Sequence, residues 1–166
     1  MKIGILTFHY TINQGSVLQA YCVKNLLQEQ FPDAEVQTIN LIPFMREKYE
    51  LKFYSKKFPF FQISKLRKYL TIRKFVYTHL NPSRKVYYND LRKQVKYINS
   101  QGFDLICTGS DTVWMDSKKL NHLIPNIYFL PKSLHAKKIS VAASVDPLNN
   151  EKPYENKSRE LTELFK

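Results

Sequence analysis

The chain has 166 residues, a formal net charge of +12, and 43% hydrophobic residues. This length suits one domain that buries roughly 70% of the surface of its unfolded chain, and this composition excludes a disordered chain. No apolar run approaches the ~20 residues of a membrane span, and the opening apolar run is too short for a signal peptide. The sequence therefore predicts a cytoplasmic protein.

The excess of positive charge predicts attraction to anions. Nucleic acid, an anionic membrane surface and an acidic sugar or phosphate ligand would all be attracted. Net charge does not choose among these partners.

The two cysteines, Cys22 and Cys107, give no disulfide framework. We expect Cys22 to lie in a helix and Cys107 in a strand. Both are interpreted as buried small hydrophobic side chains.

The first 41 residues predict a β-α-β unit. A short apolar run from Ile3 to Phe8 is typical of a strand buried on both faces. Helical spacing follows from Gly15 or Ser16, and Phe31-Pro32-Asp33 is a stop signal. Alternation over residues 34–41 then predicts a second, parallel strand with a right-handed crossover.

The loop from His9 to Ser16 joins the first strand to the first helix. In an open α/β sheet this loop lies at the carboxyl edge, where ligands bind, and the helix N-terminus beside it suits an anion. The loop has one glycine where the dinucleotide fingerprint has three, and the chain has no P-loop motif, so a nucleotide site is disfavoured. The alternative is a tight turn with Asn13 or Ser16 capping the helix.

Residues 44–88 form a basic, aromatic-rich insertion with few acids. Apolar spacing predicts a helix over 64–78, capped by Ser64 or Gln62. Such a segment could bind single-stranded nucleic acid or an anionic membrane surface, or its aromatics could pack on the core while its lysines stay in water. No RNA-binding, zinc-finger or helix-turn-helix signature supports nucleic acid, which is disfavoured.

The remaining segments continue the alternation of strands and helices. They are a helix from Tyr88 to a stop at Gly102, a strand over 103–107, a loop over 108–114, a short strand or turn over 127–130, a strand over 138–145, a loop over 146–153 and a helix over 154–166. The alternation predicts the α/β class, with a largely parallel sheet and helices on both faces. The last helix has no strand after it, so we expect a fold that is cut short.

Three stretches together carry a resemblance to a known family. They are I-G-I-L-T-F-H-Y-T-I-N-Q-G-S-V-L-Q-A at 3–20, F-D-L-I-C-T-G-S-D-T-V-W at 103–114, and Y-F-L at 128–130 followed by K-K-I-S-V-A-A-S-V at 137–145. In order and spacing they resemble the polysaccharide pyruvyl transferase family. Thr112 and Met115 depart from the family, which usually has glutamine and asparagine there, and the departure predicts a different substrate preference or a reduced activity.

The resemblance implies a two-domain, glycosyltransferase-B-like enzyme with its active site in the cleft between two Rossmann-like domains. Such enzymes transfer the enolpyruvyl-derived group of phosphoenolpyruvate to a sugar of a polysaccharide, or of its lipid-linked precursor, as a pyruvate ketal. Residues 1–166 would be the first Rossmann-like domain, on the acceptor side, truncated before the second domain that holds the donor. We therefore expect no cofactor, with phosphoenolpyruvate as the donor substrate. We expect a homo-oligomer or a complementary second domain as partner.

The resemblance also implies a set of substrate-binding residues in the two motif loops. We expect them to bind the acceptor sugar through hydrogen bonds, with Trp114 offering a flat face to a sugar ring. The alternative is that Ser110 and Asp111 cap a turn and that Trp114 belongs to the core. The set consists of Asn13, Gly15 and Gln19 in the first motif and Gly109, Ser110, Asp111 and Trp114 in the second.

Ketal formation needs a general acid, cations for phosphate and carboxylate, and in some mechanisms a base. His9 and Asp111 are the titratable residues of the motif loops and the catalytic candidates, since histidine moves protons near neutral pH. The other histidines show no metal-ligand spacing, so no metal site is expected. The isolated chain is predicted to be inactive. Two alternatives are a non-catalytic carbohydrate- or partner-binding domain with an exposed apolar patch, and a basic nucleic-acid or membrane-surface protein.

Overall fold

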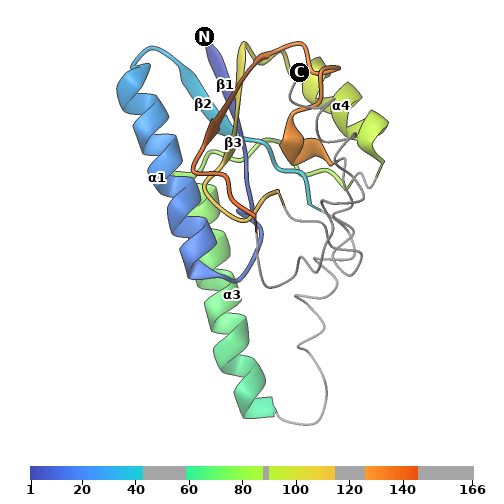
Figure 1. The fold of residues 1–166 in the computed structure, drawn as a ribbon. Coiled ribbons are helices and arrows are strands. Elements are labelled where there is room, and N and C mark those ends of the chain that lie inside the picture. The colour runs from blue at the N-terminus through green and yellow to red at the C-terminus, as the bar shows by residue number, and fades with distance from the viewer. Residues whose placement is uncertain (43–58, 88–89, 115–125, 146–166) are drawn as a thin grey trace.

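A computed structural model of the chain describes residues 1–42, 59–87, 90–114 and 126–145. Four parallel strands form a sheet in the order β2-β1-β3-β4 (Figure 1). The strands are β1 (Lys2–Leu6), β2 (Glu35–Thr38), β3 (Leu105–Gly109) and β4 (Lys137–Val141). The predicted α/β class with a parallel sheet is confirmed.

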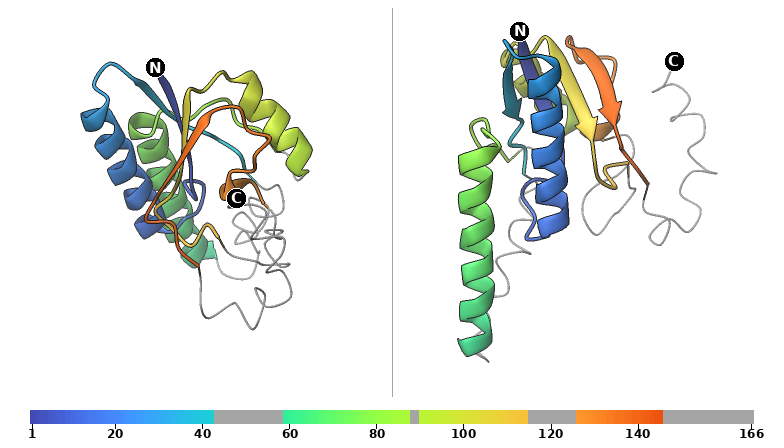
Figure 2. Two further views of the ribbon diagram at one scale, coloured as in Figure 1. Left: turned by 45° about the horizontal axis from the view of Figure 1, so that its top comes forward. Right: turned by 90° about the vertical axis from the view of Figure 1, so that its left-hand side faces the viewer.

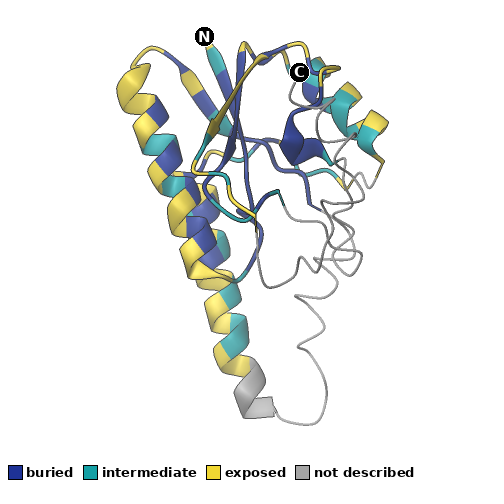
Figure 3. Cartoon of the chain, viewed as in Figure 1, coloured by how far each residue is buried: buried dark blue, intermediate teal, exposed yellow. Residues whose placement is uncertain are grey.

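The two central strands are almost completely buried, because helices cover both faces of the sheet (Figure 3). On one face Ile3 and Ile5 pack with Val23 and Leu27 of helix α1 (Gln14–Gln30). On the other face, Leu6 and Ile106 share a core with Ile98 of α4 (Leu91–Ser100) and with the 3-10 turn η2 (Ile127–Phe129). This two-sided burial explains why β1 and β3 read as continuous apolar runs.

Helix α1 begins at Gln14, one residue before the predicted start, because the side chain of Asn13 caps it. It ends at Gln30, where the predicted stop begins. The expectation that Cys22 is buried is wrong, since Cys22 is exposed, as is Leu26 one turn further along. Both lie on the outer surface of the helix, away from the sheet. Cys107, in contrast, is buried in β3, as expected.

Helix α3 (Pro59–His79) starts earlier than the predicted range of 64–78. Ser64 and Gln62 therefore lie inside the helix and do not cap it; the first helical residue is proline, which suits that position because its missing N–H has no partner there anyway. The helix packs on α1 through Ile72 and Val76, and Leu80, directly after the helix, joins the same cluster. In this part of the insertion some apolar side chains pack inward, such as Ile72 and Val76, while Leu70 and others are exposed together with most of the cations.

The segments after α3 differ from the predictions only in their limits. Gly102 has a left-handed φ of +66° just after α4, as a helix stop requires. Residues 127–129 form the 3-10 turn, which agrees with the turn alternative, and β4 ends at Val141 rather than at 145. The predictions for 146–153 and 154–166, for Tyr88 and for the aromatics before residue 59 lie outside the described residues.

None of the helices within the described ranges is long enough and apolar enough to cross a membrane.

Candidate functional site

The carboxyl ends of β1 and β3 lie next to each other at the centre of the sheet. The chain leaves β1 toward β2 on one side, and leaves β3 toward β4 on the other, so this is the topological switch point where open α/β sheets bind ligands. Leu6 pairs with Thr108 in the register, so Thr7 and Gly109 follow together at this edge. The loops after both strands are therefore neighbours, as the sequence predicts.

Two buried hydroxyls stand at this edge, the Oγ1 of Thr7 and the Oγ of Ser110. Within the described ranges neither has a hydrogen-bond partner. An unpaired buried hydroxyl costs stability, so each of the two needs an explanation, of which a functional role is one.

His9, the catalytic candidate of the first loop, is completely buried. Its Nδ1 lies 3.1 Å from the carbonyl oxygen of Thr7, and its Nε2 lies 2.9 Å from Oδ1 of Asn40. Burial lowers the pKa of the imidazole, and the charge of Arg73 adds to this, while both hydrogen bonds act in the opposite direction. The ring joins the ends of β1 and β2, and both of its nitrogens are used within the protein.

The other first-loop candidates lie at the start of α1 and are exposed. Oδ1 of Asn13 accepts a hydrogen bond of 2.9 Å from the backbone N–H of Gly15, so the capping alternative is confirmed for Asn13. Gln19 lies one turn further along the helix. The side chain of Asn13 is therefore occupied in part by the helix, and contact of these three residues with a ligand stays a prediction.

The second loop is tied closely to the end of β4. Gly109 has a φ of +128°, and a Cβ atom there would lie 2.2 Å from the carbonyl oxygen of Val141. The next N–H, of Ser110, donates to that same oxygen at 2.8 Å. Ser110 itself has a φ of +49°, which is uncommon outside glycine. Only glycine fits at 109, because the two backbones approach so closely.

Asp111 and Trp114 both make contacts inside the protein. Oδ1 of Asp111 accepts from the backbone N–H of Thr112 at 2.7 Å, so Asp111 does cap a turn. The indole N–H of Trp114 donates to the carbonyl oxygen of Tyr128 at 3.1 Å, and its ring stacks on Phe129 with centroids 6.1 Å apart. Trp114 is half-buried at the edge of the core. Trp114 therefore packs against the core, and its role as a platform for a sugar ring stays a prediction.

A side-chain hydrogen bond joins Tyr10 of the first loop to Tyr128 of η2. Burial raises the pKa of Tyr128 well above its usual value, and Tyr10 raises it further by its charge and by a side-chain hydrogen bond. The charge of Asp111 is the smallest cause and raises the same pKa. Tyr128 therefore stays protonated at neutral pH.

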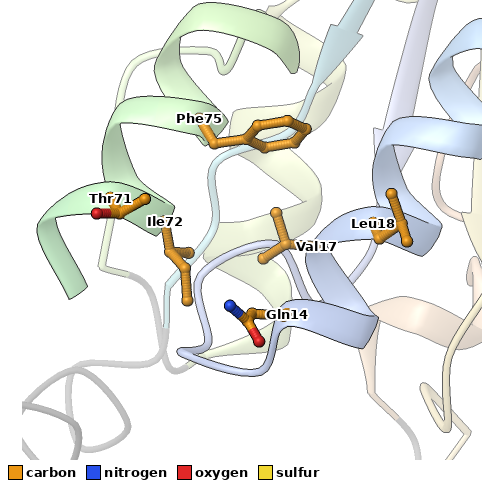
Figure 4. Close-up of a pocket in the computed structure, with 6 residues that line it drawn as sticks. All are labelled: Gln14, Val17, Leu18, Thr71, Ile72 and Phe75. Carbon is orange, nitrogen blue, oxygen red and sulfur yellow. The ribbon is translucent and has the colours of Figure 1, made fainter. Parts of the chain in front are cut away.

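A separate open hollow of about 260 Å³ lies between α1 and α3 (Figure 4). Its lining is mostly apolar and comes from α1 and α3. No residue of the second loop lines it. Gln14 and Thr71 are its polar members; the others are Val17, Leu18, Ile72 and Phe75. This hollow lacks the converging polar groups of the switch point. Among the described residues, no three His, Cys, Asp or Glu side chains are grouped as a metal site would need.

Comparison with protein-family models identifies one match. The model described as "Polysaccharide pyruvyl transferase" matches residues 13–166, which is most of the chain. The chain belongs to the polysaccharide pyruvyl transferase family. Comparison with curated proteins gives no match, and neither does comparison with solved structures. The range matched to this pyruvyl transferase family begins at the cap of α1 and includes the whole second loop.

Three residues near the ends of β1 and β3 were not among the predicted site residues of this pyruvyl transferase family member. Tyr10 and Tyr128 lie inside stretches that carry the resemblance, so a signal was present, but only the fold pairs them. Arg73 has no local signal. Its Nη2 donates to the carbonyl oxygen of Tyr10 at 2.6 Å and its guanidinium lies 5.1 Å from the centre of the Tyr69 ring, so α3 supports the first loop directly.

Proposed function

We propose that this chain provides the acceptor-binding side of pyruvate ketal transfer from phosphoenolpyruvate to a sugar. The acceptor would belong to an exopolysaccharide, a capsule or a cell-wall glycan precursor. The observation that carries the proposal is the pair of buried hydroxyls, those of Thr7 and Ser110, that have no partner among the described residues where the loops after β1 and β3 meet at the switch point, in a chain that belongs to the pyruvyl transferase family.

The chemistry of these groups suits a sugar. The carboxylate of Asp111 accepts hydrogen bonds from sugar hydroxyls and would take the proton of the attacking hydroxyl. The hydroxyl of Ser110 supplies a donor, and a site built to pair sugar hydroxyls discriminates strongly against analogues that lack them. The exposed cap of α1, with Asn13, Gly15 and Gln19, forms the outer wall of this proposed site.

Donor activation needs more than these residues. Phosphoenolpyruvate carries a phosphate and a carboxylate, and each needs cationic partners. Arg73 is the cation bonded to the first loop, and its guanidinium already holds the carbonyl of Tyr10. We therefore propose that residues 1–166 alone bind acceptor but do not transfer the pyruvyl group. Phosphate release above background, on incubation with phosphoenolpyruvate and a pyruvylatable acceptor, would contradict this.

Acceptor binding is tested with Ser110→Ala, because it removes a hydroxyl that the described protein does not pair. Titration calorimetry against neutral hexose and N-acetylhexosamine disaccharides should find one that binds, and Ser110→Ala should weaken it roughly 5- to 10-fold. Stability should change by less than ~0.5 kcal/mol. Ser133→Ala, at an exposed serine after η2, is the matched control. Equal affinities in both variants would remove Ser110 from the site.

A partner-binding role is the second candidate, and exposed apolar side chains favour it. Leu18, Cys22 and Leu26 repeat every four residues along the outer surface of α1, and all three are exposed. Leu18→Lys should abolish any concentration-dependent association seen by analytical ultracentrifugation. A wild-type chain that stays monomeric at all concentrations would remove self-association from consideration.

A further inference from the structure

The face of α3 that points away from α1 has an unusual composition. Ile63, Arg67, Leu70, Lys74 and Tyr77 follow a spacing of four and three residues, so they lie on one face of the helix. We call this set the outer stripe. It lies opposite Ile72 and Val76, which pack on α1.

The outer stripe is exposed although it carries three large apolar side chains. Ile63 is 49% exposed, Leu70 56% and Tyr77 59%. Single exposed apolar residues are ordinary on a protein surface, but a contiguous row of them marks an interaction site. Arg67 and Lys74 stand between the apolar residues and are also exposed.

The charge of α3 decides what kind of surface the stripe fits. Five of its residues are Lys or Arg and none is Asp or Glu, in a chain whose net charge is +12. We propose that the outer stripe docks the protein on an anionic lipid bilayer, with Ile63, Leu70 and Tyr77 in the interface and Arg67 and Lys74 on lipid phosphates. Apolar and basic residues interleaved on one helix face are the pattern that lies in such an interface.

Other occupants fit the outer stripe less well. A second copy of the chain would place Arg67 and Lys74 against the same cations, which repel. Nucleic acid would satisfy the cations, and Tyr77 could stack on a base, but Ile63 and Leu70 would gain nothing from a phosphodiester backbone. A bilayer interface satisfies both kinds of side chain at once.

The placement of α3 gives this docking a direction. The first half of the helix extends past the N-terminal end of α1, at the carboxyl edge of the sheet (Figure 2). A bilayer bound along the outer stripe would therefore lie on the side of α3 away from α1, and the start of the stripe would extend beyond the edge that carries the two motif loops. The docking itself does not rest on the proposed sugar chemistry, because nothing in the stripe belongs to that site.

The test is cosedimentation of the 1–166 chain with vesicles. We expect binding to phosphatidylcholine vesicles that contain about one third phosphatidylglycerol at low salt, and loss of most binding at about 0.5 M salt. Vesicles of phosphatidylcholine alone should bind little. No binding to the anionic vesicles at low salt would overturn the proposal.

Variants separate the outer stripe from general positive charge. Arg67→Gln/Lys74→Gln should weaken the partition coefficient by roughly 10-fold or more. Lys93→Gln/Lys96→Gln removes the same charge from exposed positions on α4, across the sheet, and should weaken it by less than roughly 3-fold. Equal losses in the two variants would overturn the proposal, because charge alone would then explain the binding.

The apolar part of the stripe has its own pair of variants. Ile63→Ser/Leu70→Ser should lower the partition coefficient roughly 10-fold, whereas Leu26→Ser, at an exposed leucine of α1, should leave it unchanged. Two other outcomes would overturn membrane docking in favour of another occupant. One is tighter binding to single-stranded RNA with the same variant dependence, and the other is a dimer in the absence of vesicles that Ile63→Ser/Leu70→Ser dissociates.

Discussion

The loop from Gly109 to Trp114 and the outer stripe of α3 use their residues in opposite ways. In the loop, Gly109 allows the backbone of β4 to approach closely, Asp111 caps a turn, and Trp114 donates a hydrogen bond to the carbonyl oxygen of Tyr128. Nearly every group of the loop therefore supports the fold. In the outer stripe, Ile63 and Leu70 project into solvent and contribute little to the fold. Residues of the loop therefore serve stability and the proposed function together, whereas the apolar residues of the stripe need an explanation outside the fold.

The largest expected effect is at Gly109. Gly109→Ala should cost about 3 kcal/mol or more of unfolding free energy, because its Cβ would collide with the carbonyl oxygen of Val141 at a φ of +128°. Gly102→Ala is the matched control, since it also has a positive φ but nothing lies within 4 Å of its Cβ position. That variant should cost about 1 kcal/mol. Equal losses in urea denaturation would show that close approach does not constrain the loop.

His9 should give the second effect, which depends on pH. Its pKa in the folded state is lowered from 6.5, mainly by burial, so the unfolded chain takes up a proton first as the pH falls. The contribution of His9 is therefore complete above about pH 6.5 and is lost as the pH falls through the lower folded pKa.

His9→Gln tests this directly. The substitution should cost about 1–3 kcal/mol at pH 7, because it breaks the link between the Thr7 carbonyl and Asn40. It should also flatten the dependence of unfolding free energy on pH below 6.5. His135→Gln, at an exposed histidine, should keep the wild-type slope. An unchanged slope in His9→Gln would mean that another group causes the acid sensitivity.

The smallest effect should be found on the outer stripe. Helix α3 supplies both variants for this test, one on each of its two faces. Ile72→Ala, facing α1, should cost about 2–4 kcal/mol. Leu70→Ala, two residues away on the opposite face, should change stability by less than ~0.5 kcal/mol. If thermal unfolding gave similar losses for both, the stripe would be part of the core and not a docking face.

Much of the fold could be predicted from local patterns. The β-α-β unit, the helix stop at Gly102 and the strand before Gly109 follow from apolar periodicity and from residues with special backbone angles. The start of α3 could not be placed, because helical apolar spacing became visible only from Ile63 onward. The exposure of Cys22 was also missed, because periodicity identifies a helix but does not say how much of its surface its neighbours cover.

The candidate site was predicted as a location rather than as a set of contacts. Parallel topology alone brings the loops after β1 and β3 to one edge, and the motif spacing could therefore identify both. The hydrogen bond between Tyr10 and Tyr128 and the contact of Arg73 with Tyr10 join residues more than 60 positions apart in the sequence. Such pairs depend on the packing of α3 and η2, which no local pattern specifies.

The contrast between the two cysteines makes the chain suited to selective chemical labelling. Cys107 is buried in β3, and burial raises the pKa of its thiol to about 11, so at neutral pH it is neither accessible nor ionised. Cys22 is exposed on α1. A maleimide dye should therefore attach to Cys22 alone in the folded protein, and alkylation of Cys107 should then measure how often the sheet opens.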